Sequence, residues 1–248
     1  MVATTTIDRT RSEELLGAFI EIEMHLRRVL RQRPEVSFTA LIDMAARSSP
    51  IVRRFESDLK QYGDLRNAIV HVRRDNQPIA EPHPDTVEHL KRIAAMIMEP
   101  PQVSELGTIE VIRCSPHDPI GEVARSMREN FFSQVPVYDG REFVGLLTTD
   151  AITWWMGAQL KCHDGLFEDR PVSEVLPYRD ASSTEAFVCR TTEIAAIIER
   201  FESTMRAGKK LEAVIVTQNG QRNESPLQIV TVYDLPQLYR MVSGESVS

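Results

Sequence analysis

Two short stretches of this 248-residue chain establish its architecture: GLLTTD at residues 145–150 and QIVTVYD at residues 228–234. In each stretch an apolar run is followed by threonine and then by aspartate. The apolar runs predict buried strands, and the polar residues predict helix starts, because Thr and Asp side chains cap helix N-termini. We therefore expect a strand-to-helix junction near Thr148 and a second one near Thr231.

The predicted elements around both stretches follow the same order: strand, helix, strand, strand, helix. The first copy comprises a strand at Ile109–Cys114, a helix at 120–127, two strands within 134–147 and a helix from Asp150. The second comprises a strand at Phe187–Arg190, a helix at 194–201, strands at 211–216 and 227–232 and a helix from Asp234. In the first copy, Asp139-Gly140 favours a tight turn between the paired strands. The sequence therefore predicts an internal repeat, with one copy at 105–172 and the other at 173–248.

The first 104 residues contain no convincing strand. Apolar residues three and four positions apart predict four amphipathic helices there. We expect these helices at Leu15–Val29, at Phe38–Ala46, from Pro50 to Ile69, and after Pro84 as far as Ile97. The predicted fold class is α+β multidomain: a four-helix bundle at 1–104, followed by a pair of β-α-β-β-α repeats.

Composition limits the kind of protein. The chain has 42% hydrophobic residues and a net charge of -7, and it lacks both a signal-peptide profile and an apolar run of the roughly 20 residues that span a membrane. We expect a cytoplasmic protein that does not enter a membrane. Its three cysteines are too few for a disulfide framework or a cysteine metal site, so we expect reduced thiols.

Residues 107–243 resemble a pair of CBS domains, the tandem module that binds adenosine-containing nucleotides. The family's third strand ends in Gly, two apolar residues, Ser or Thr, two variable residues and Asp. The second copy keeps the spacing from Thr231 to Asp234 but has Gln228 in place of the glycine, whereas the first keeps Gly145 but runs one residue short between Thr148 and Asp150. The resemblance implies a homodimer and an adenosine-containing ligand: ATP, ADP, AMP, S-adenosylmethionine or a cyclic dinucleotide.

The resemblance also implies roles for the motif residues. The aspartate would accept the ribose hydroxyls, while the threonine and the helix N-terminus would meet phosphate. By place in the repeat, the second site would contain Thr231, Asp234, Arg190, Thr191, Ala213 and Val214. The first site would contain Thr148, Thr149, Asp150, Ser115, Pro116, Gln134 and Val135. The alternative interpretation is that these Thr and Asp residues only cap helices.

In the helical region, Arg66, Asn67 and His71 lie late in the third predicted helix. Residues 12–99 resemble a HEPN domain, whose ribonuclease members carry Arg, a polar residue, several more residues and His. The resemblance implies metal-independent RNA cleavage by a dimer, with His71 taking the 2'-hydroxyl proton, Arg66 stabilising the phosphorane and Asn67 orienting. At 100° per residue Arg66 and His71 point about 140° apart, so one chain does not easily bring them together.

Two functions remain open. The first is a ribonuclease without a metal requirement, acting on RNA and gated by an adenine nucleotide bound to the repeats. The alternative is a non-catalytic nucleotide-binding regulatory protein whose helical bundle dimerises or recruits a partner, with Arg66 paired structurally. A third possibility is that both regions are degenerate scaffolds.

Overall fold

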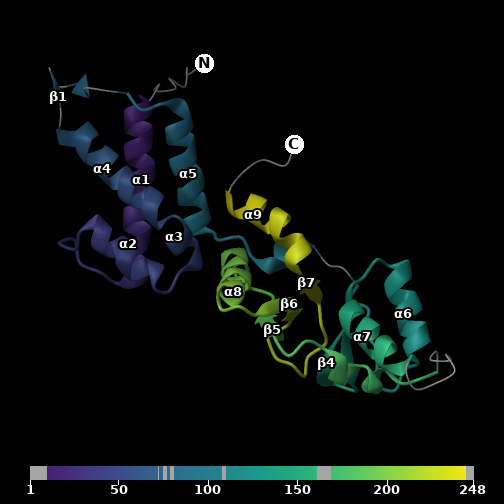
Figure 1. The fold of residues 1–248 in the computed structure, drawn as a ribbon. Helices are drawn as coiled ribbons and strands as arrows, with labels where there is room; N and C mark the ends of the chain where they lie inside the picture. The colour runs from purple at the N-terminus through teal and green to yellow at the C-terminus, as the bar shows by residue number, and fades with distance from the viewer. Residues whose placement is uncertain are drawn as a thin grey trace, which may run out of the picture. The chain divides into compact units, whose positions relative to one another are not determined.

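The computed structural model describes residues 10–71, 73–74, 77–78, 81–107, 110–160 and 169–243, with side chains of 71–80 left out (Figure 1). The chain divides into two compact units. One, the helical unit, contains the residues up to Pro101 together with Glu193–Ala196 and the residues from Gln237 onward. The other, the repeat unit, contains Gln102–Thr192 and Ile197–Pro236.

The helical unit contains α1 (Arg11–Leu30), α2 (Phe38–Ala46), α3 (Pro50–Arg54), α4 (Glu56–His71) and α5 (Pro84–Met98). Local sequence fixes where these helices begin: Thr10 forms a capping box with Glu13, Ser37 and Ser49 cap α2 and α3, and prolines start α3 and α5. Helix α1 packs against α5, α4 and α2 (Figure 1). The core is formed by Leu15, Phe19, Ile22, Leu26, Leu41, Ile42, Ile51, Leu59, Leu90, Ile93 and Ile97.

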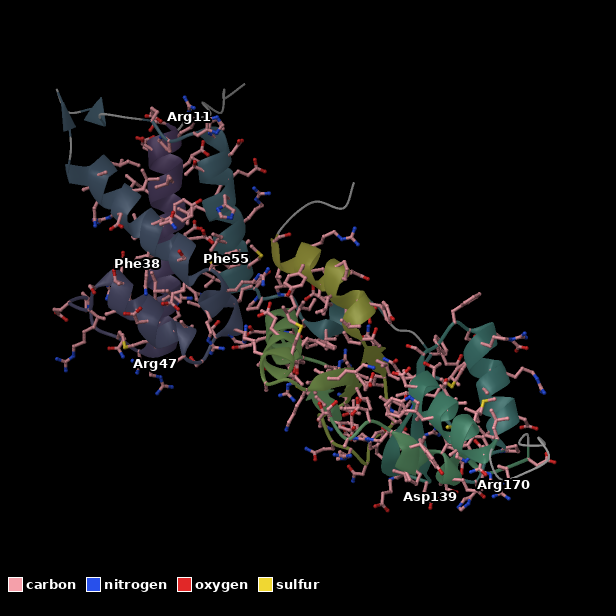
Figure 2. The ribbon with its side chains drawn as sticks, in the orientation of Figure 1. Arg11, Phe38, Arg47, Phe55, Asp139 and Arg170 are labelled. Carbon is pink, nitrogen blue, oxygen red and sulfur yellow. The ribbon has the colours of Figure 1, made fainter. Side chains whose placement is uncertain are left out.

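The single helix predicted from Pro50 to Ile69 is two helices in the structure. The chain turns at Phe55, whose φ of -99° and ψ of 14° end α3, and Phe55 itself is buried (Figure 2). The break has a packing reason, because α3 contacts α2 and α5 whereas α4 contacts α1 and α2. Val29, predicted on the apolar stripe of the first helix, is 64% exposed.

The repeat unit contains two small sheets. In the first copy, α6 (Ile120–Glu129) precedes the antiparallel pair of β3 (Gln134–Asp139) and β4 (Glu142–Thr148), and α7 (Thr149–Gln159) follows. The strands turn at Gly140, which has a φ of +61°, next to Asp139 (Figure 2). In the second copy, β6 (Lys210–Thr217) lies between β5 (Ser183–Cys189), which is parallel to it, and β7 (Gln228–Val230), which is antiparallel.

Helix α8 (Ile194–Arg206) connects β5 to β6, and β7 leads through the 3-10 turn η4 (Val232–Asp234) into α9 (Leu235–Ser243). The junctions predicted at Thr148 and Thr231 are confirmed, since Thr148 caps α7 and Thr231 caps η4. The predicted strand Ile109–Cys114 is not formed over the residues that are described, from Glu110 onward. Cys114 alone makes a parallel bridge to Val137, so this strand is reduced to one residue.

The two copies are joined crosswise by a tripeptide, Val-Ser-Glu, that precedes each of them. It begins the 3-10 turns η1 (Val103–Leu106) and η2 (Val172–Glu174). The amide of Val103 donates to the carbonyl of Thr192 at 2.9 Å, and the amide of Val172 donates to the carbonyl of Asp118 at 3.0 Å. The following serines do the same: Ser104 bonds Arg190 at 3.2 Å and Ser173 bonds Pro116 at 2.9 Å. Each tripeptide therefore docks on the turn of the other copy.

Apolar packing reinforces this exchange. Val103 and Val172 are both fully buried, and Val172 belongs to the core of the first copy with Val137, Leu147 and Trp155. A separate cluster joins the strands of both copies through Tyr138, Phe143, Leu146, Ala213 and Ile215.

No helix among the described residues is long and apolar enough to cross a membrane.

Replacement of Val172 by Ala should destabilise the first copy, although Val172 precedes the second. Loss of two buried methyl groups and the space they leave should cost about 2 kcal/mol of unfolding free energy. Hydrogen exchange should accelerate at the Ile120 amide, which donates to the carbonyl of Arg170 at 2.8 Å. The control is Val144→Ala at a side chain that is 45% exposed, where we expect a change below about 0.5 kcal/mol. Equal effects of both variants would contradict crosswise docking.

Candidate functional site

A cavity of about 320 Å³ opens in the repeat unit at the end of β7. Three stretches of chain line it: the irregular segment before Cys114, the connection from α6 to β3, and β7 with η4. The lining residues are Glu110, Val111, Ile112, Phe131, Phe132, Ser133, Gln134, Ile229, Thr231, Tyr233 and Asp234. A volume of this size lies at the lower end of the range for small-molecule pockets, about 300–1,000 Å³.

Thr231 and Asp234 form a reciprocal cap at the polar side of this cavity. One carboxylate oxygen, Oδ2 of Asp234, accepts from the Thr231 amide at 2.7 Å and from the Thr231 hydroxyl at 3.0 Å. The Thr231 hydroxyl in turn accepts from the amide of Tyr233 at 3.3 Å. Among the described residues none donates to the other oxygen, Oδ1. The cap therefore fixes the carboxylate while leaving one oxygen for a ligand hydroxyl.

Aromatic side chains at the edge of the cavity are unusually exposed. Phe131 is 94% exposed and has a φ of +56°, a left-handed conformation that is uncommon for a residue of this size. Tyr233 is 80% exposed and follows Thr231 by two residues. Large exposed aromatic faces beside a pocket suit the binding of a flat, apolar ring.

The structure brings together only part of each residue set predicted from the sequence. Gln134, predicted for the first site, lines the same cavity as Thr231 and Asp234, and its Nε2 donates to the carbonyl of Glu212 at 2.8 Å. The other residues predicted for the second site lie elsewhere: Ala213 and Val214 are fully buried in β6, and Arg190 and Thr191 are exposed at the turn after β5.

The remaining residues predicted for the first site are also distributed. Ser115 and Pro116 lie in the turn before α6, where the Ser115 amide donates to Asp118 at 2.7 Å, and Val135 is buried in β3. Thr148 caps α7 through a 3.1 Å bond from the Ala151 amide. Thr149 donates its amide to the carbonyl of Ser133, and Asp150 is exposed in the first turn of α7.

The place corresponding to the cavity in the first copy is nearly filled. The space lined by Thr148, Arg179, Ser183, Glu185 and Glu212 measures about 10 Å³, roughly the room that one water molecule needs. Its lining residue Glu212 is already bonded: Lys210 Nζ lies 2.9 Å from Glu212 and 3.2 Å from Asp150, and the Ser183 hydroxyl donates to Glu212 at 2.7 Å. The aspartate of the first motif is therefore already paired with a lysine.

A second set of ion pairs borders the same small space. Glu185, whose side chain is only 9% exposed, pairs with Arg179 at 3.1 Å and with Arg222 at 3.0 Å. Arg222 also stacks over the rings of Phe143 and Phe187. Arginine suits this position because its planar guanidinium can pair and stack at once.

In the helical unit, Arg66 is half-buried on α4. Its Nη1 donates to Oδ1 of the neighbouring Asn67 at 3.1 Å, and its guanidinium lies 5.9 Å from the ring centre of Phe19. Asn67 is exposed. The backbone of His71 ends α4, but its side chain lies outside the described residues. The described contacts give Arg66 a packing role without a carboxylate partner.

Among the residues that the structure describes, the cysteines and acidic side chains form no metal-binding cluster. Within the described ranges, no group of three His, Cys, Asp or Glu side chains could hold a metal ion. Cys114 and Cys189 carry free thiols, and burial raises the pKa of Cys114 to about 12, which keeps that thiol protonated. Cys162 lies outside the described residues.

A family model of the CBS domain matches residues 103–156, which include the first Val-Ser-Glu tripeptide, Gln134 and the Thr148 motif. The chain carries a tandem pair of CBS-like repeats. The predicted fold class is confirmed, since the helical region α1–α5 is followed by these CBS-like β-α repeats. No curated protein matches the sequence at a significant level.

Several solved structures are similar to parts of this chain. A putative acetoin utilization protein from Vibrio cholerae is 12% identical, with a TM-score of 0.43, over 59% of this chain and 98% of its own. A putative archaeal homolog of g-AMPK from Methanocaldococcus jannaschii is 20% identical, with a TM-score of 0.43, over 68% and 57% of the two chains. A CBS domain pair solved with 5'-methylthioadenosine and S-adenosyl-L-methionine is 15% identical, with a TM-score of 0.40, over 56% and 96%.

Replacement of Lys210 by Met should destabilise the repeat unit by about 1 kcal/mol at neutral pH, because Asp150 and Glu212 lose their shared cation. The hydrogen bonds to Glu212 and then to Asp150 raise the pKa of Lys210 above its ordinary 10.5. Because the pKa of Lys210 is higher in the folded state than in the unfolded state, its ion pairs stabilise the fold fully below pH 10.5. This stabilisation is lost as the pH rises through the folded-state pKa.

The difference between wild type and Lys210→Met should therefore disappear at strongly alkaline pH in urea unfolding. The exposed neighbour Lys209, changed to Met, serves as the control and should change stability by less than about 0.5 kcal/mol. A Lys210→Met effect that is equal at neutral and strongly alkaline pH would argue against the ion pairs.

Proposed function

We propose that the CBS-like pair binds one adenosine-containing molecule per chain, in the cavity at Thr231 and Asp234, and acts as a regulatory module. The proposal rests mainly on Asp234. Thr231 holds its carboxylate in place through Oδ2, and Oδ1 stays available to a ligand beside a cavity of about 320 Å³. Ribose offers two adjacent hydroxyls to such an oxygen, and adenine offers a flat ring to Phe131 and Tyr233. The candidate ligands are ATP, ADP, AMP, S-adenosylmethionine and cyclic dinucleotides.

The two copies differ in a way that supports a single site. In the first copy, Lys210 satisfies Asp150 and the remaining space admits about one water molecule. A ligand would have to break the pairs of Lys210 and Glu212 before it could enter, so its binding there would be weak. The stoichiometry that we expect is one ligand per chain.

Regulation would proceed through α9. This helix begins directly after Asp234, and its residues from Gln237 onward belong to the helical unit. Within that unit, Tyr239 of α9 lies 5.0 Å below the guanidinium of Arg54, which ends α3. A ligand that holds Asp234 would therefore bias a helix whose far end contacts the bundle, which is the kind of shared element that coupling requires.

The proposal favours the non-catalytic function over the ribonuclease. The alternative interpretation supposed a structural partner for Arg66, for example an acidic neighbour; the described contacts of Arg66 are instead with Asn67 and the ring of Phe19. The ribonuclease, its RNA substrate and the homodimer stay predictions that rest on family resemblance.

Calorimetric titration with ATP, ADP, AMP, S-adenosylmethionine and a cyclic dinucleotide should reveal a ligand with one site per chain. Asp234→Ala should weaken its binding about tenfold or more, because a hydrogen bond to a charged acceptor contributes about 1.5–3 kcal/mol. The matched control is Asp150→Ala in the closed first copy, which we expect to change affinity less than about twofold. Two ligands per chain, or equal losses in both variants, would overturn the single-site proposal.

RNA cleavage distinguishes the two functions. We expect wild type and His71→Ala to leave single-stranded RNA equally intact in the absence of metal, with and without nucleotide, because Arg66 is packed against its own chain. The measurement is gel analysis of end-labelled RNA after long incubation. If wild type cleaves the RNA to leave a cyclic phosphate and His71→Ala does not, the ribonuclease hypothesis would be supported instead.

A further inference from the structure

A second, polar cavity of about 220 Å³ lies in the repeat unit. Its lining comes from Arg113 before Cys114, from Tyr138 and Arg141 at the β3–β4 turn, and from the loop between β6 and β7, residues 223–225. None of these residues lines the cavity at Thr231 and Asp234. The two cavities are therefore separate features of the repeat unit.

Tyr138, which lines this cavity, carries an unsatisfied polar group. The residue is only 4% exposed, its ring packs edge-on against Phe143 with centroids 5.4 Å apart, and its hydroxyl is buried with no hydrogen-bond partner among the described residues. A buried hydroxyl without a partner is unfavourable in a folded protein, so such a group calls for an explanation. Burial raises the pKa of Tyr138, and the nearby positive charges of Arg113 and Arg222 oppose that rise, so the hydroxyl remains an O–H donor at neutral pH.

The charges at the cavity favour an anion. Arg113 and Arg141 are exposed, and neither forms an ion pair with any carboxylate of the described residues. The one acidic residue in the lining, Glu224, is already engaged, because its carboxylate accepts from the amide and the side chain of Asn219 at 2.7 and 2.6 Å. These bonds lower the pKa of Glu224 to about 2. The lining of this cavity therefore contains two guanidinium groups and one carboxylate, which is already bonded to Asn219.

We propose that this cavity binds the phosphate or carboxylate group of a small molecule. Arg113 and Arg141 supply the guanidinium donors, which match the oxygens of such groups in pairs, and Tyr138 supplies the third donor. The volume is below the 300–1,000 Å³ that is common for larger ligands, so a small acid fits better than a nucleotide. The proposal does not depend on the nucleotide site.

The test is titration calorimetry of the full chain with inorganic phosphate and, separately, with acetate, at an ionic strength held constant with chloride. Saturable binding of phosphate alone identifies a phosphate site, and binding of acetate alone identifies a carboxylate site; either result supports the proposal. Arg141→Ala should weaken the binding about tenfold. Arg125→Ala, at an exposed residue of α6 that lines neither cavity, should change it less than about twofold.

Tyr138→Phe separates binding from folding. Because the hydroxyl has no partner in the free chain, its removal should leave the melting temperature unchanged or raise it, while lowering affinity for the anion about fivefold to tenfold. A lower melting temperature with unchanged affinity would show that the hydroxyl has a structural role. Absence of saturable binding by both anions, or equal weakening in Arg125→Ala and Arg141→Ala, would also overturn the proposal.

Discussion

The repeat unit depends on one exchange of backbone hydrogen bonds, in which Val103 and Val172 each donate to a turn in the opposite copy. Both valines are fully buried, so the amides they carry have no access to water and need these carbonyl partners. The exchange fixes how the turn before α6 and the turn before α8 are oriented. Within the repeat unit, Gln134 at the start of β3 then lines the cavity at Thr231 and Asp234.

The two copies have similar elements but different sites, because the two strand-to-helix junctions differ in length and share only their Thr and Asp residues. The second motif has one more residue between Thr and Asp, and this residue makes room for the η4 turn and the reciprocal cap of Thr231 with Asp234. The first motif lacks it, so Thr148 caps α7 directly and Asp150 faces outward to Lys210. Glu212 and Glu185 then complete a charged cluster in a space that is open in the other copy.

The sequence predicted the helices and the hairpin well because their signals are local: capping residues, apolar spacing and a glycine in a turn. The predicted site residues coincide with the lining of this cavity only at Thr231, Asp234 and Gln134, because the others were assigned by place within one copy whereas the lining comes from both copies. Gln134 of the first copy therefore lines the cavity that contains Thr231 and Asp234 of the second copy. One signal was available, the identical Val-Ser-Glu at 103–105 and 172–174, and its crosswise docking needed the structure. The break at Phe55 also depends on tertiary neighbours.

The exchanged tripeptides mean that the repeat in the sequence is not the unit that folds. A fragment cut to the boundaries of the family match would carry Val103, whose partner lies in the second copy, and would lack Val172, which fills its own core. In such a fragment the carbonyls of Asp118 and Pro116 would lose their amide donors, and the core beside Leu147 would lose the side chain of Val172. Two fragments could instead restore each other by trading segments, as in a domain-swapped pair. Duplication in this chain has therefore produced two halves that are mutually dependent rather than two copies that could separate.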